Sequence, residues 1–340
     1  MVFRLRFGEA DLLRCRFAIS PRWETQEAVR TLRRPERLGY HRPWLRRIRE
    51  AAEGLDLRPL WLLMPQRGHT PDFLCPPPGS AAGSFAEEMA RVRAACADPS
   101  AVRADLERSL RCTPGAAESA AGRAMLADPL RAADELADLT ERAWRALVEP
   151  HWPRLRALLE ADVAFHTRRL AAEGLAGLFA GLHPDLSWDE ATATLTLHRP
   201  GRHDREPGGQ GLVLLPSAFV WPEVAGGFDP PWQPTVAYPA RGVGALWSEV
   251  RDPAPRALAR LLGRTRADVL CALDEPAATG ELALRLGLAA SSVSEHLKAL
   301  EGAGLLTTHR QGRRVRYERT PLGIALAAAG GPASEGPRVS

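Results

Sequence analysis

The first residues of the chain alternate between apolar and polar side chains. Phe3, Leu5 and Phe7 share one side of an extended segment and are separated by arginines, which predicts a half-buried strand. Apolar residues then recur at helical spacing over residues 23–33 and 43–53, with turn-forming prolines and a glycine between these stretches. We therefore expect the chain to open with a strand followed by helices.

The middle of the chain changes from helical to strand-like patterning. Residues 84–181 are rich in Ala, Leu, Arg and Glu, with large apolar side chains at helical spacing. From Ala193, apolar residues alternate with threonine, and residues 212–220 form an apolar run between a polar turn and a Pro-rich segment. We expect residues 1–250 to form an N-terminal domain of mixed helices and strands, with subdivisions near residues 83 and 185.

The clearest pattern lies towards the end of the chain, within residues 255–328. Thr279 is placed to cap a helix that holds Glu281 in its first turn, where a carboxylate is favourable. Gly287 then supplies a turn, and the next helix carries an apolar face that includes Val293 and Leu297. Two helices joined by a glycine turn are typical of a helix-turn-helix.

A basic β-hairpin follows these helices. Residues 305–308 and 315–319 have strand character, and Gln311 and Gly312 form the turn between them. Helix, glycine turn, helix and basic hairpin in this order are typical of a winged helix-turn-helix. The predicted fold class is therefore α+β: a mixed helical and β N-terminal domain, then a winged helix-turn-helix at residues 255–328 with a three-helix core and a β-hairpin wing. Residues 330–340 are small and polar and are expected to form a flexible tail.

Duplex DNA is the target that this layout suits. A helix fits the major groove, where short polar side chains in its first turns reach base edges. Arginines on a hairpin lie along phosphates or enter a minor groove. The candidate DNA-binding residues are the polar side chains of the second and third helices and of the hairpin: Thr279, Ser291, Ser292, Ser294, Glu295, His296, Lys298, His309, Arg310, Gln311, Arg313, Arg314 and Arg316.

Each of these features also has a simpler explanation. A glycine turn occurs in helical hairpins that never touch DNA, and an arginine-rich hairpin is usually a solvated surface. Serines near a helix start are most often caps, and Ser292 and Glu295 have the spacing of a capping box. The complete set in the required order favours DNA binding, with protein or RNA binding as an alternative.

The distribution of charge agrees with a DNA-binding C-terminal segment. The net charge is +4, and residues 251–320 hold twelve Lys or Arg and eight Asp or Glu, so the whole surplus lies there. Lys298 is the single lysine of the chain, so a GC-rich coding sequence is a competing reason for the abundance of arginine.

Cysteine usage and apolar runs bear on the compartment. The five cysteines are scattered and include no CxxC pair, which fits a reduced, intracellular protein better than a disulfide framework or a zinc ribbon. No signal peptide opens the chain, and the apolar run at residues 211–222 is too short to cross a bilayer. We expect a cytoplasmic protein that does not bind membranes.

Several stretches of the C-terminal segment resemble the ArsR-type winged-helix repressors. They are TGELALRLGL from Thr279, VSEHLKALEGAGL from Val293 and GRRVRY from Gly312, and TPLG from Thr320 resembles the start of the closing helix. The resemblance covers about the last quarter of the chain. It implies a homodimer that binds a pseudo-palindromic operator. The residues placed at the dimer contact are Leu258, Leu261, Leu262 and the helix that contains residues 324–326.

One position departs from the ArsR-type pattern. Ala289 stands where such sequences usually place a serine that caps the recognition helix. The helix is then expected to begin at Ser291 or Ser292, which shifts the base-contacting positions by as much as a turn.

The larger N-terminal part is similar to an uncharacterised domain that precedes ArsR-type modules in bacterial, actinobacterial-like regulators. The shared motifs are HRPWL from His41, TPDFL from Thr70, HWPRLR from His151, FVWP from Phe219 and PARGVG from Pro239. The resemblance implies a regulator and supplies no ligand.

The usual metal-sensing positions of ArsR-type proteins lack ligands in this chain. Arsenic- and cadmium-type sensors carry cysteines on the helix before the turn, and residues 279–286 contain none. The closing helix, residues 323–329, has no His, Asp or Glu, and Cys271 is expected to pack in the core. His198, His203 and Asp204 are close in sequence but lie in a Pro/Gly-rich turn that favours a solvated loop. We predict no metal site and no cofactor.

Nothing in the sequence names a reaction. GxSxG, HExxH and P-loop patterns are absent, and Asp185, Asp189 and Glu190 are explained equally well as caps. We therefore predict a regulator, not an enzyme, and expect the N-terminal domain to bind an unknown small-molecule effector, a partner or its own twin. An enzyme-like or ligand-binding N-terminal domain with an accessory winged helix is the alternative. Tryptophans that could line an apolar pocket are Trp23, Trp44, Trp61, Trp144, Trp152, Trp221 and Trp232.

Overall fold

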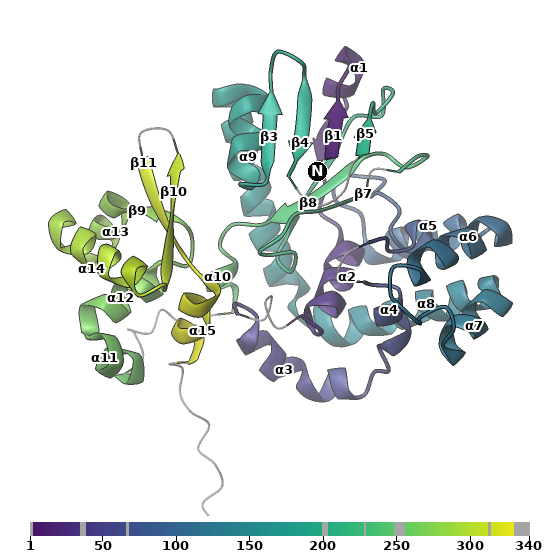
Figure 1. Cartoon of the computed structure of the whole chain (residues 1–340), viewed down its shortest axis with the longest axis horizontal. Helices are drawn as coiled ribbons and strands as arrows, with labels where there is room; N and C mark the ends of the chain where they lie inside the picture. The colour runs from purple at the N-terminus through teal and green to yellow at the C-terminus, as the bar shows by residue number, and fades with distance from the viewer. Residues whose placement is uncertain are drawn as a thin grey trace, which may run out of the picture. The chain divides into compact units, whose positions relative to one another are not determined.

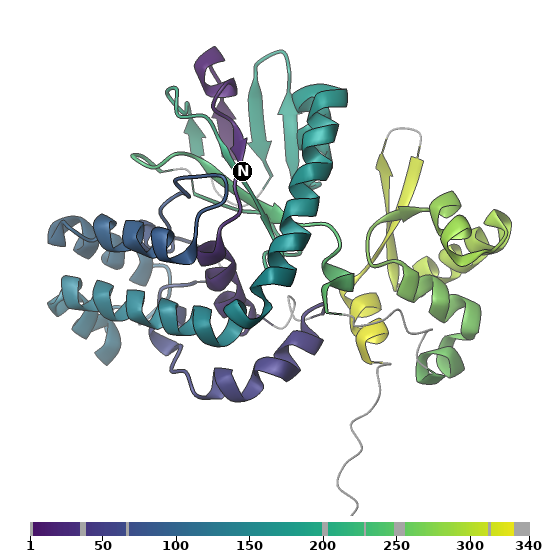
Figure 2. The same cartoon turned by 180° about the vertical axis from the view of Figure 1, so that it is seen from behind.

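The chain folds into two compact units, shown in two views in Figures 1 and 2. The computed structural model describes residues 3–34, 39–65, 68–198, 203–227, 229–247, 256–311 and 314–329. The first unit comprises Met1–Arg34 and Ile48–Ala240, and the second comprises Pro35–Arg47 and Arg241–Ser340. The second unit thus includes an early segment that the sequence pattern placed in the N-terminal domain. The expected flexible tail, residues 330–340, lies outside the described residues.

One four-stranded sheet of the first unit begins with the predicted opening strand. Strand β1 (Phe3–Arg6) pairs antiparallel with β4 (Thr194–Leu197) and parallel with β5 (His203–Arg205), and β3 (Leu186–Asp189) completes the order β3-β4-β1-β5. Leu5 and Phe7 are buried, so the prediction of a half-buried strand is confirmed.

The second sheet of this unit is more deeply buried. Its strands are β2 (Arg16–Phe17), β6 (Val213–Ser217), β8 (Thr235–Pro239) and β7 (Ala225–Gly227), in the order β2-β6-β8-β7. Every residue of β6 is buried, which explains its continuous apolar character. Strand β5 lies in the predicted polar turn and β8 in the predicted Pro-rich connection, so these two strands were not expected.

Helices account for most of the rest of the first unit. They are α1 (Glu9–Leu12), α2 (Pro21–Thr31), α4 (Arg58–Leu62), α5 (Phe85–Ala95), α6 (Pro99–Leu110), α7 (Ala120–Ala127), α8 (Pro129–Ala143) and α9 (Trp152–Leu182), with α3 (Arg42–Glu53) shared between the units. Figure 1 shows α9 lying beside the sheet that contains β3. Among the described helices, none has both the length and the apolar character needed to cross a membrane.

Helix α2 is buried almost throughout and carries charged side chains into the interior. Arg22 is 1% exposed, and its guanidinium donates to the carbonyl oxygens of Leu74 (2.8 Å) and Pro76 (3.0 Å). Glu88 of α5 accepts from the Arg22 backbone N–H at 2.9 Å. Glu24 accepts from the Ala218 N–H at 2.9 Å, and burial raises its pKa to about 8. These hydrogen bonds offset much of the cost of burying the three side chains, although one polar atom of each has no hydrogen-bond partner among the described residues.

The second unit is a small helical bundle with a three-stranded sheet. Its helices are α10 (Val243–Leu246), α11 (Arg256–Leu262), α12 (Arg264–Ala272), α13 (Thr279–Leu286), α14 (Ala290–Gly302) and α15 (Pro321–Ala329). Strands β9 (Ala277–Ala278), β10 (Leu306–Gln311) and β11 (Arg314–Arg319) form the sheet in the order β10-β11-β9. Leu270, Leu282, Val293 and Leu297 lie at the centre of its apolar core.

Residues from the early segment pack inside this second unit. The rings of Trp44 and Trp247 stack with centroids 6.2 Å apart, and the indole N–H of Trp247 donates to Nδ1 of His41 at 3.1 Å. The guanidinium of Arg319 lies over the Tyr40 ring. Trp44 and His41 are completely buried, so the early segment contributes core to the unit that holds the helix-turn-helix pattern.

Candidate nucleic-acid interface

The turn between α13 and α14 depends on a glycine in the left-handed region. Gly287 has φ 66° and ψ 31°, a conformation that residues with a Cβ atom rarely adopt. The N–H of Leu288 donates to the Ala283 carbonyl at 3.0 Å, which closes the end of α13. The glycine turn predicted from the sequence is therefore present.

The start of α13 differs from the expectation in one detail. Thr279 is the first helical residue and not the cap, because the N-cap position is occupied by Ala278. The Glu281 carboxylate takes over the capping role by accepting the Ala278 N–H at 3.1 Å.

Helix α14 begins earlier than the sequence suggested. Ala289 occupies the N-cap position without a side-chain hydrogen bond, and the helix starts at Ala290 instead of Ser291 or Ser292. The hydroxyl of Ser292 lies 3.4 Å from Nε2 of His296, so it is not engaged as a helix cap. All three predicted serines consequently lie within the first turns of α14.

The two faces of α14 differ sharply in burial. Val293, Leu297 and Leu300 are buried against the core of the unit. Ser291, Glu295 and Lys298 are exposed, and the remaining predicted polar residues of this helix are half-buried: Ser292, Ser294 and His296. The apolar side fixes the helix to its unit and leaves a polar side available for a ligand.

The hairpin places basic residues on paired positions. His309 of β10 lies opposite Arg316 of β11, and Thr308 lies opposite Tyr317. Because side chains alternate across a strand, His309 and Arg316 face away from the buried Tyr317. Strand β11 also pairs with β9, so the hairpin is joined to the segment just before α13.

Two acidic groups partly balance this basic surface. Arg316 pairs with Glu281 at 3.3 Å, and His309 lies 3.3 Å from the Glu318 carboxylate. Burial raises the pKa of Glu318, while His309 acts in the opposite direction. Both basic side chains are at least partly exposed, so DNA phosphates can compete for them.

The tip of the hairpin is only partly described. Arg310, Gln311 and Arg314 are strand residues near the tip. Arg313, also predicted to contact DNA, lies outside the described residues.

The base of the hairpin is held by close packing. A Cβ atom on Gly323 would lie 2.1 Å from the Leu305 carbonyl oxygen, so only glycine allows α15 to approach this closely. Thr320 accepts from the Gly323 N–H at 3.1 Å and donates to the Gly304 carbonyl at 2.7 Å. Arg319, which is not among the predicted DNA-binding residues, is buried and donates to the Leu273 carbonyl at 2.6 Å, so its role is structural.

Two comparisons with known proteins concern this part of the chain. Residues 261–309 match a helix-turn-helix domain family. The HTH-type transcriptional regulator CmtR of Mycobacterium bovis is 45% identical over 84 residues, which cover 24% of this chain and 71% of the relative. CmtR of two Mycobacterium tuberculosis strains matches with the same identity and coverage. This chain belongs to the HTH-type transcriptional regulators.

A second protein family matches a segment that lies almost entirely in the first unit of the regulator. Residues 86–244 match a family of unknown function, DUF5937. No solved structure matches the chain significantly. The regulator is thus a DNA-binding protein whose helix-turn-helix accompanies a region with no assigned role.

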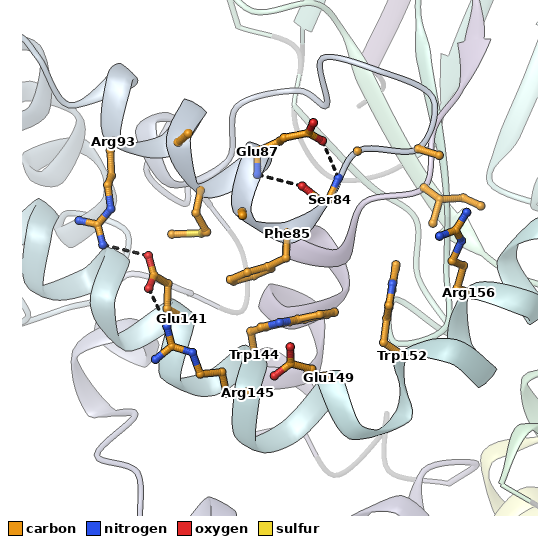
Figure 3. A pocket seen from close by; sticks show the side chains of 16 residues that line it. Ser84, Phe85, Glu87, Arg93, Glu141, Trp144, Arg145, Glu149, Trp152 and Arg156 are labelled. Carbon is orange, nitrogen blue, oxygen red and sulfur yellow. Dashed lines mark hydrogen bonds and ion pairs between the residues drawn. The ribbon is translucent and has the colours of Figure 1, made fainter.

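The first unit of the regulator contains an aromatic cavity, shown in Figure 3. Its volume is about 760 Å³, and Phe85, Trp144 and Trp152 stand in its wall. Phe85 stacks on Trp144 with ring centroids 4.6 Å apart, and Trp152 meets Trp144 edge-on at 5.4 Å. A π-helical stretch, Trp144–Val148, begins at the first of these tryptophans, and such stretches are frequent at functional sites.

Charged residues around the aromatic cavity are arranged in ion pairs. Arg93 bonds the carboxylates of Asp138 (2.7 Å) and Glu141 (2.9 Å), and Arg145 bonds Glu141 at 3.2 Å. In Figure 3 Arg93, Glu141 and Arg145 lie to one side of the stacked Phe85 and Trp144 rings. The apolar wall is consequently flanked by a largely neutralised polar rim.

The other predicted candidates are dispersed. Trp144 and Trp152 line the aromatic cavity, whereas Trp44 is core of the second unit. His198 bonds Ser187 at 2.8 Å, and Asp204 lies 3.9 Å from Arg4, so these two have different partners. The side chain of His203 lies outside the described set.

Burial also changes the candidates for a dimer contact. Leu258 and Ile324 are 2% and 1% exposed and pack inside the second unit, so they are unavailable to a partner copy. Leu261 is 69% exposed, and Leu322 is 59% exposed. Leu261 therefore remains a candidate for the interface, and Leu322, which was not among the predicted contact residues, becomes one because it is exposed on the same helix as Ile324.

Proposed function

We propose that the protein is an ArsR-type winged-helix repressor that binds its operator as a homodimer. Helix α14 enters the major groove, and the β10–β11 hairpin acts as a wing along the neighbouring backbone. The bases are contacted from Ser291, Ser292, Ser294, Glu295 and His296. Phosphates are contacted from Thr279, Lys298 and the hairpin residues His309, Arg310, Gln311, Arg313, Arg314 and Arg316.

The observation that carries this proposal is the division of α14 into an anchored apolar face and an exposed polar face. Val293 and Leu297 are fully buried, while Ser291 and Lys298 on the other side are exposed. A short side chain such as serine lets a helix approach base edges closely. The identity of 45% to CmtR regulators over the matched 84 residues supports the same use of the module.

The test is a set of binding isotherms on duplex DNA from upstream of the protein's own gene, beside a scrambled duplex, at several salt concentrations. We expect the wild type to prefer the native duplex and to bind more weakly as salt rises. An Arg310→Ala/Arg314→Ala variant should lose affinity for both duplexes, with a log–log salt slope shallower by about 2, since each phosphate contact contributes about 0.9.

The matched control is Arg260→Ala/Arg266→Ala, which removes two exposed arginines of the same unit from α11 and α12. It should retain the salt slope of the wild type. Equal weakening by both double variants would mean that overall charge, not the hairpin, attracts DNA, and equal affinity of the wild type for both duplexes would contradict operator recognition.

The dimer is proposed to form through Leu261 and Leu322, which are exposed among the described leucines of the second unit. A Leu261→Glu/Leu322→Glu variant should sediment as a monomer at concentrations where the wild type is dimeric. A wild type that is monomeric at micromolar concentration would exclude this arrangement while leaving one-site DNA binding intact.

The aromatic cavity is proposed to receive the effector, a flat, largely apolar molecule. Stacked rings offer such a ligand large contact area, and the neutralised rim favours no strongly charged one. The probe is N-phenyl-1-naphthylamine, an uncharged aromatic compound whose fluorescence rises in apolar sites. Ala86→Trp, on the cavity wall, should abolish the signal, whereas Ala94→Trp on the same helix outside the cavity should preserve it. Equal signals from the two variants would place the probe elsewhere.

A further inference from the structure

Three potential metal ligands converge in the first unit, far from the DNA-binding module in sequence. They are His69, Asp72 at the start of the short 3-10 helix Asp72–Leu74, and Asp105 of α6. One ligand atom from each lies within 4.8 Å of the other two. Nε2 of His69 is in direct contact with Oδ1 of Asp105, and these two side chains are only 11% and 15% exposed.

Backbone and hydroxyl contacts fix two of these ligands in place. The second oxygen of Asp105 accepts the Phe73 N–H at 3.2 Å, which connects α6 to the segment that carries Asp72. The Ser109 hydroxyl donates to the His69 carbonyl at 3.0 Å, and the His69 N–H donates to Sγ of Cys112 at 3.3 Å. Outer contacts of this type orient metal ligands in known sites.

A second cavity opens beside the cluster and gives a cation a route from solvent. Its volume is about 350 Å³, and Asp72, Asp105 and Arg108 line it together with Trp232. Arg108 forms an ion pair with Asp229. Its positive charge is therefore shared with a third carboxylate and does not by itself offset both Asp72 and Asp105.

The unbalanced charge of the cluster favours a divalent cation. Asp72 and Asp105 each have a carboxylate oxygen within 4.8 Å of the other, and both are only partly exposed, so their negative charges repel each other. An ion of charge +2 would offset both carboxylates, and one imidazole with two carboxylates is a donor set that suits Zn²⁺. His69 contacts Asp105 directly, and because an imidazole carries at most one positive charge it can offset no more than one of these two carboxylates.

We propose that His69, Asp72 and Asp105 bind a divalent transition-metal cation of the Zn²⁺ class. The cation takes Nε2 of His69 and one oxygen from each aspartate, and the cavity leaves at least one further position for water or an anionic ligand. Zinc bonds of about 2.1 Å place tetrahedral donor atoms about 3.4 Å apart, so a bound cation would replace the direct hydrogen bond between His69 and Asp105 and hold Asp72 at this spacing. This site lies in the first unit and uses no cysteine. It therefore differs from the cysteine sites that arsenic- and cadmium-type sensors carry on the helix before the turn.

The test is calorimetric titration of tag-free, full-length protein with ZnCl₂, beside the Asp72→Asn and His69→Gln variants. We expect one Zn²⁺ per chain in the wild type and at least tenfold weaker binding in each variant. Zinc should raise the Tm of the wild type and leave the Tm of Asp72→Asn almost unchanged. In the metal-free state, Asp72→Asn should be at least as stable as the wild type, because the substitution removes repulsion from Asp105.

The matched control is His198→Ala, which removes a histidine from the sheet and should retain the affinity of the wild type for zinc. Circular dichroism tests whether each variant is folded. If His69→Gln is unfolded, the result for Asp72→Asn decides the test. Absence of zinc binding, or equal affinity of wild type and Asp72→Asn, would overturn the proposal. Neither outcome depends on DNA binding, so failure of the metal site and failure of the repressor proposal are separate results.

Discussion

Helices α2 and α14 use polar side chains in opposite ways. Helix α2 is buried on nearly all sides, so Arg22 and Glu24 must find partners within the protein. Helix α14 buries only Val293, Leu297 and Leu300 and leaves its polar side in solvent. A buried charged helix is held in place by the hydrogen bonds it makes, whereas a helix with a free polar face is held by its apolar residues. The polar side chains of α2 therefore stabilise the fold, whereas those of α14 are available to bind a partner.

The largest effect is expected from removing the buried guanidinium of α2. Arg22→Ala would leave the carbonyls of Leu74 and Pro76 without their donor and the Glu88 carboxylate without its nearby positive charge. We expect a loss of about 3–5 kcal/mol in the free energy of unfolding, as for other broken buried charge networks. Urea unfolding measures it. Arg103→Ala, at an exposed position of α6, is the control and should change stability by less than about 0.5 kcal/mol. Similar losses of stability in Arg22→Ala and Arg103→Ala would contradict the expectation that the buried guanidinium of Arg22 contributes more than an exposed one.

A smaller effect should appear in the pH dependence of stability. The pKa of Glu24 is raised from its usual 4.5 to about 8 in the folded protein. Between these values the folded state holds a proton that the unfolded state has lost, so this residue makes stability fall as pH rises from 4.5 to 8. The slope from this one group approaches about 1.4 kcal/mol per pH unit inside that window.

Glu24→Gln should remove this part of the slope, because glutamine does not titrate, and denaturant unfolding at several pH values between 5 and 8.5 measures it. The matched substitution on the exposed side of α14, Glu295→Gln, should leave the wild-type profile in place. An unchanged profile in Glu24→Gln would show that Glu24 is already ionised in the folded protein.

The smallest effect on stability is expected on the exposed side of α14. Lys298→Ala should change the free energy of unfolding by no more than about 0.5 kcal/mol, yet make the salt slope of DNA binding shallower by about 1. Its neighbour Leu297 is completely buried, so Leu297→Ala should cost about 2–5 kcal/mol. A Lys298→Ala variant that loses stability while keeping its salt slope would reverse the roles assigned to the two sides of this helix.

The sequence predicted those strands and turns that are determined by residues close together in the chain. The alternation at Leu195 and Leu197 marks β4, and Gly287 marks the turn of the helix-turn-helix. The start of α14 was placed too late because Ala289 lacks the side-chain oxygen that normally marks an N-cap.

Features created by distant contacts could not be predicted in this way. Strand β7 forms only because β8 supplies a hydrogen-bonding partner, and its own sequence, Ala-Gly-Gly, carries no strand signal. Arg22 has the composition of a surface residue, and its burial follows from carbonyls more than fifty residues away in the chain. Asp72 and Asp105 are likewise brought together by tertiary packing, since no short-range spacing links them to His69.

The second unit is built from two separate segments of the chain, and this affects whether its DNA-binding module can be transferred to another protein. A module appended by simple gene fusion has one junction with its neighbour and can be excised at that point. Here the unit also uses Pro35–Arg47, so a chain shortened to begin at Arg241 would lack His41 and Trp44 and would expose the face of Trp247 that they cover. Recombination that moved only the last hundred residues to another protein would therefore transfer an incomplete core. The module and the beginning of its own chain are expected to be inherited together.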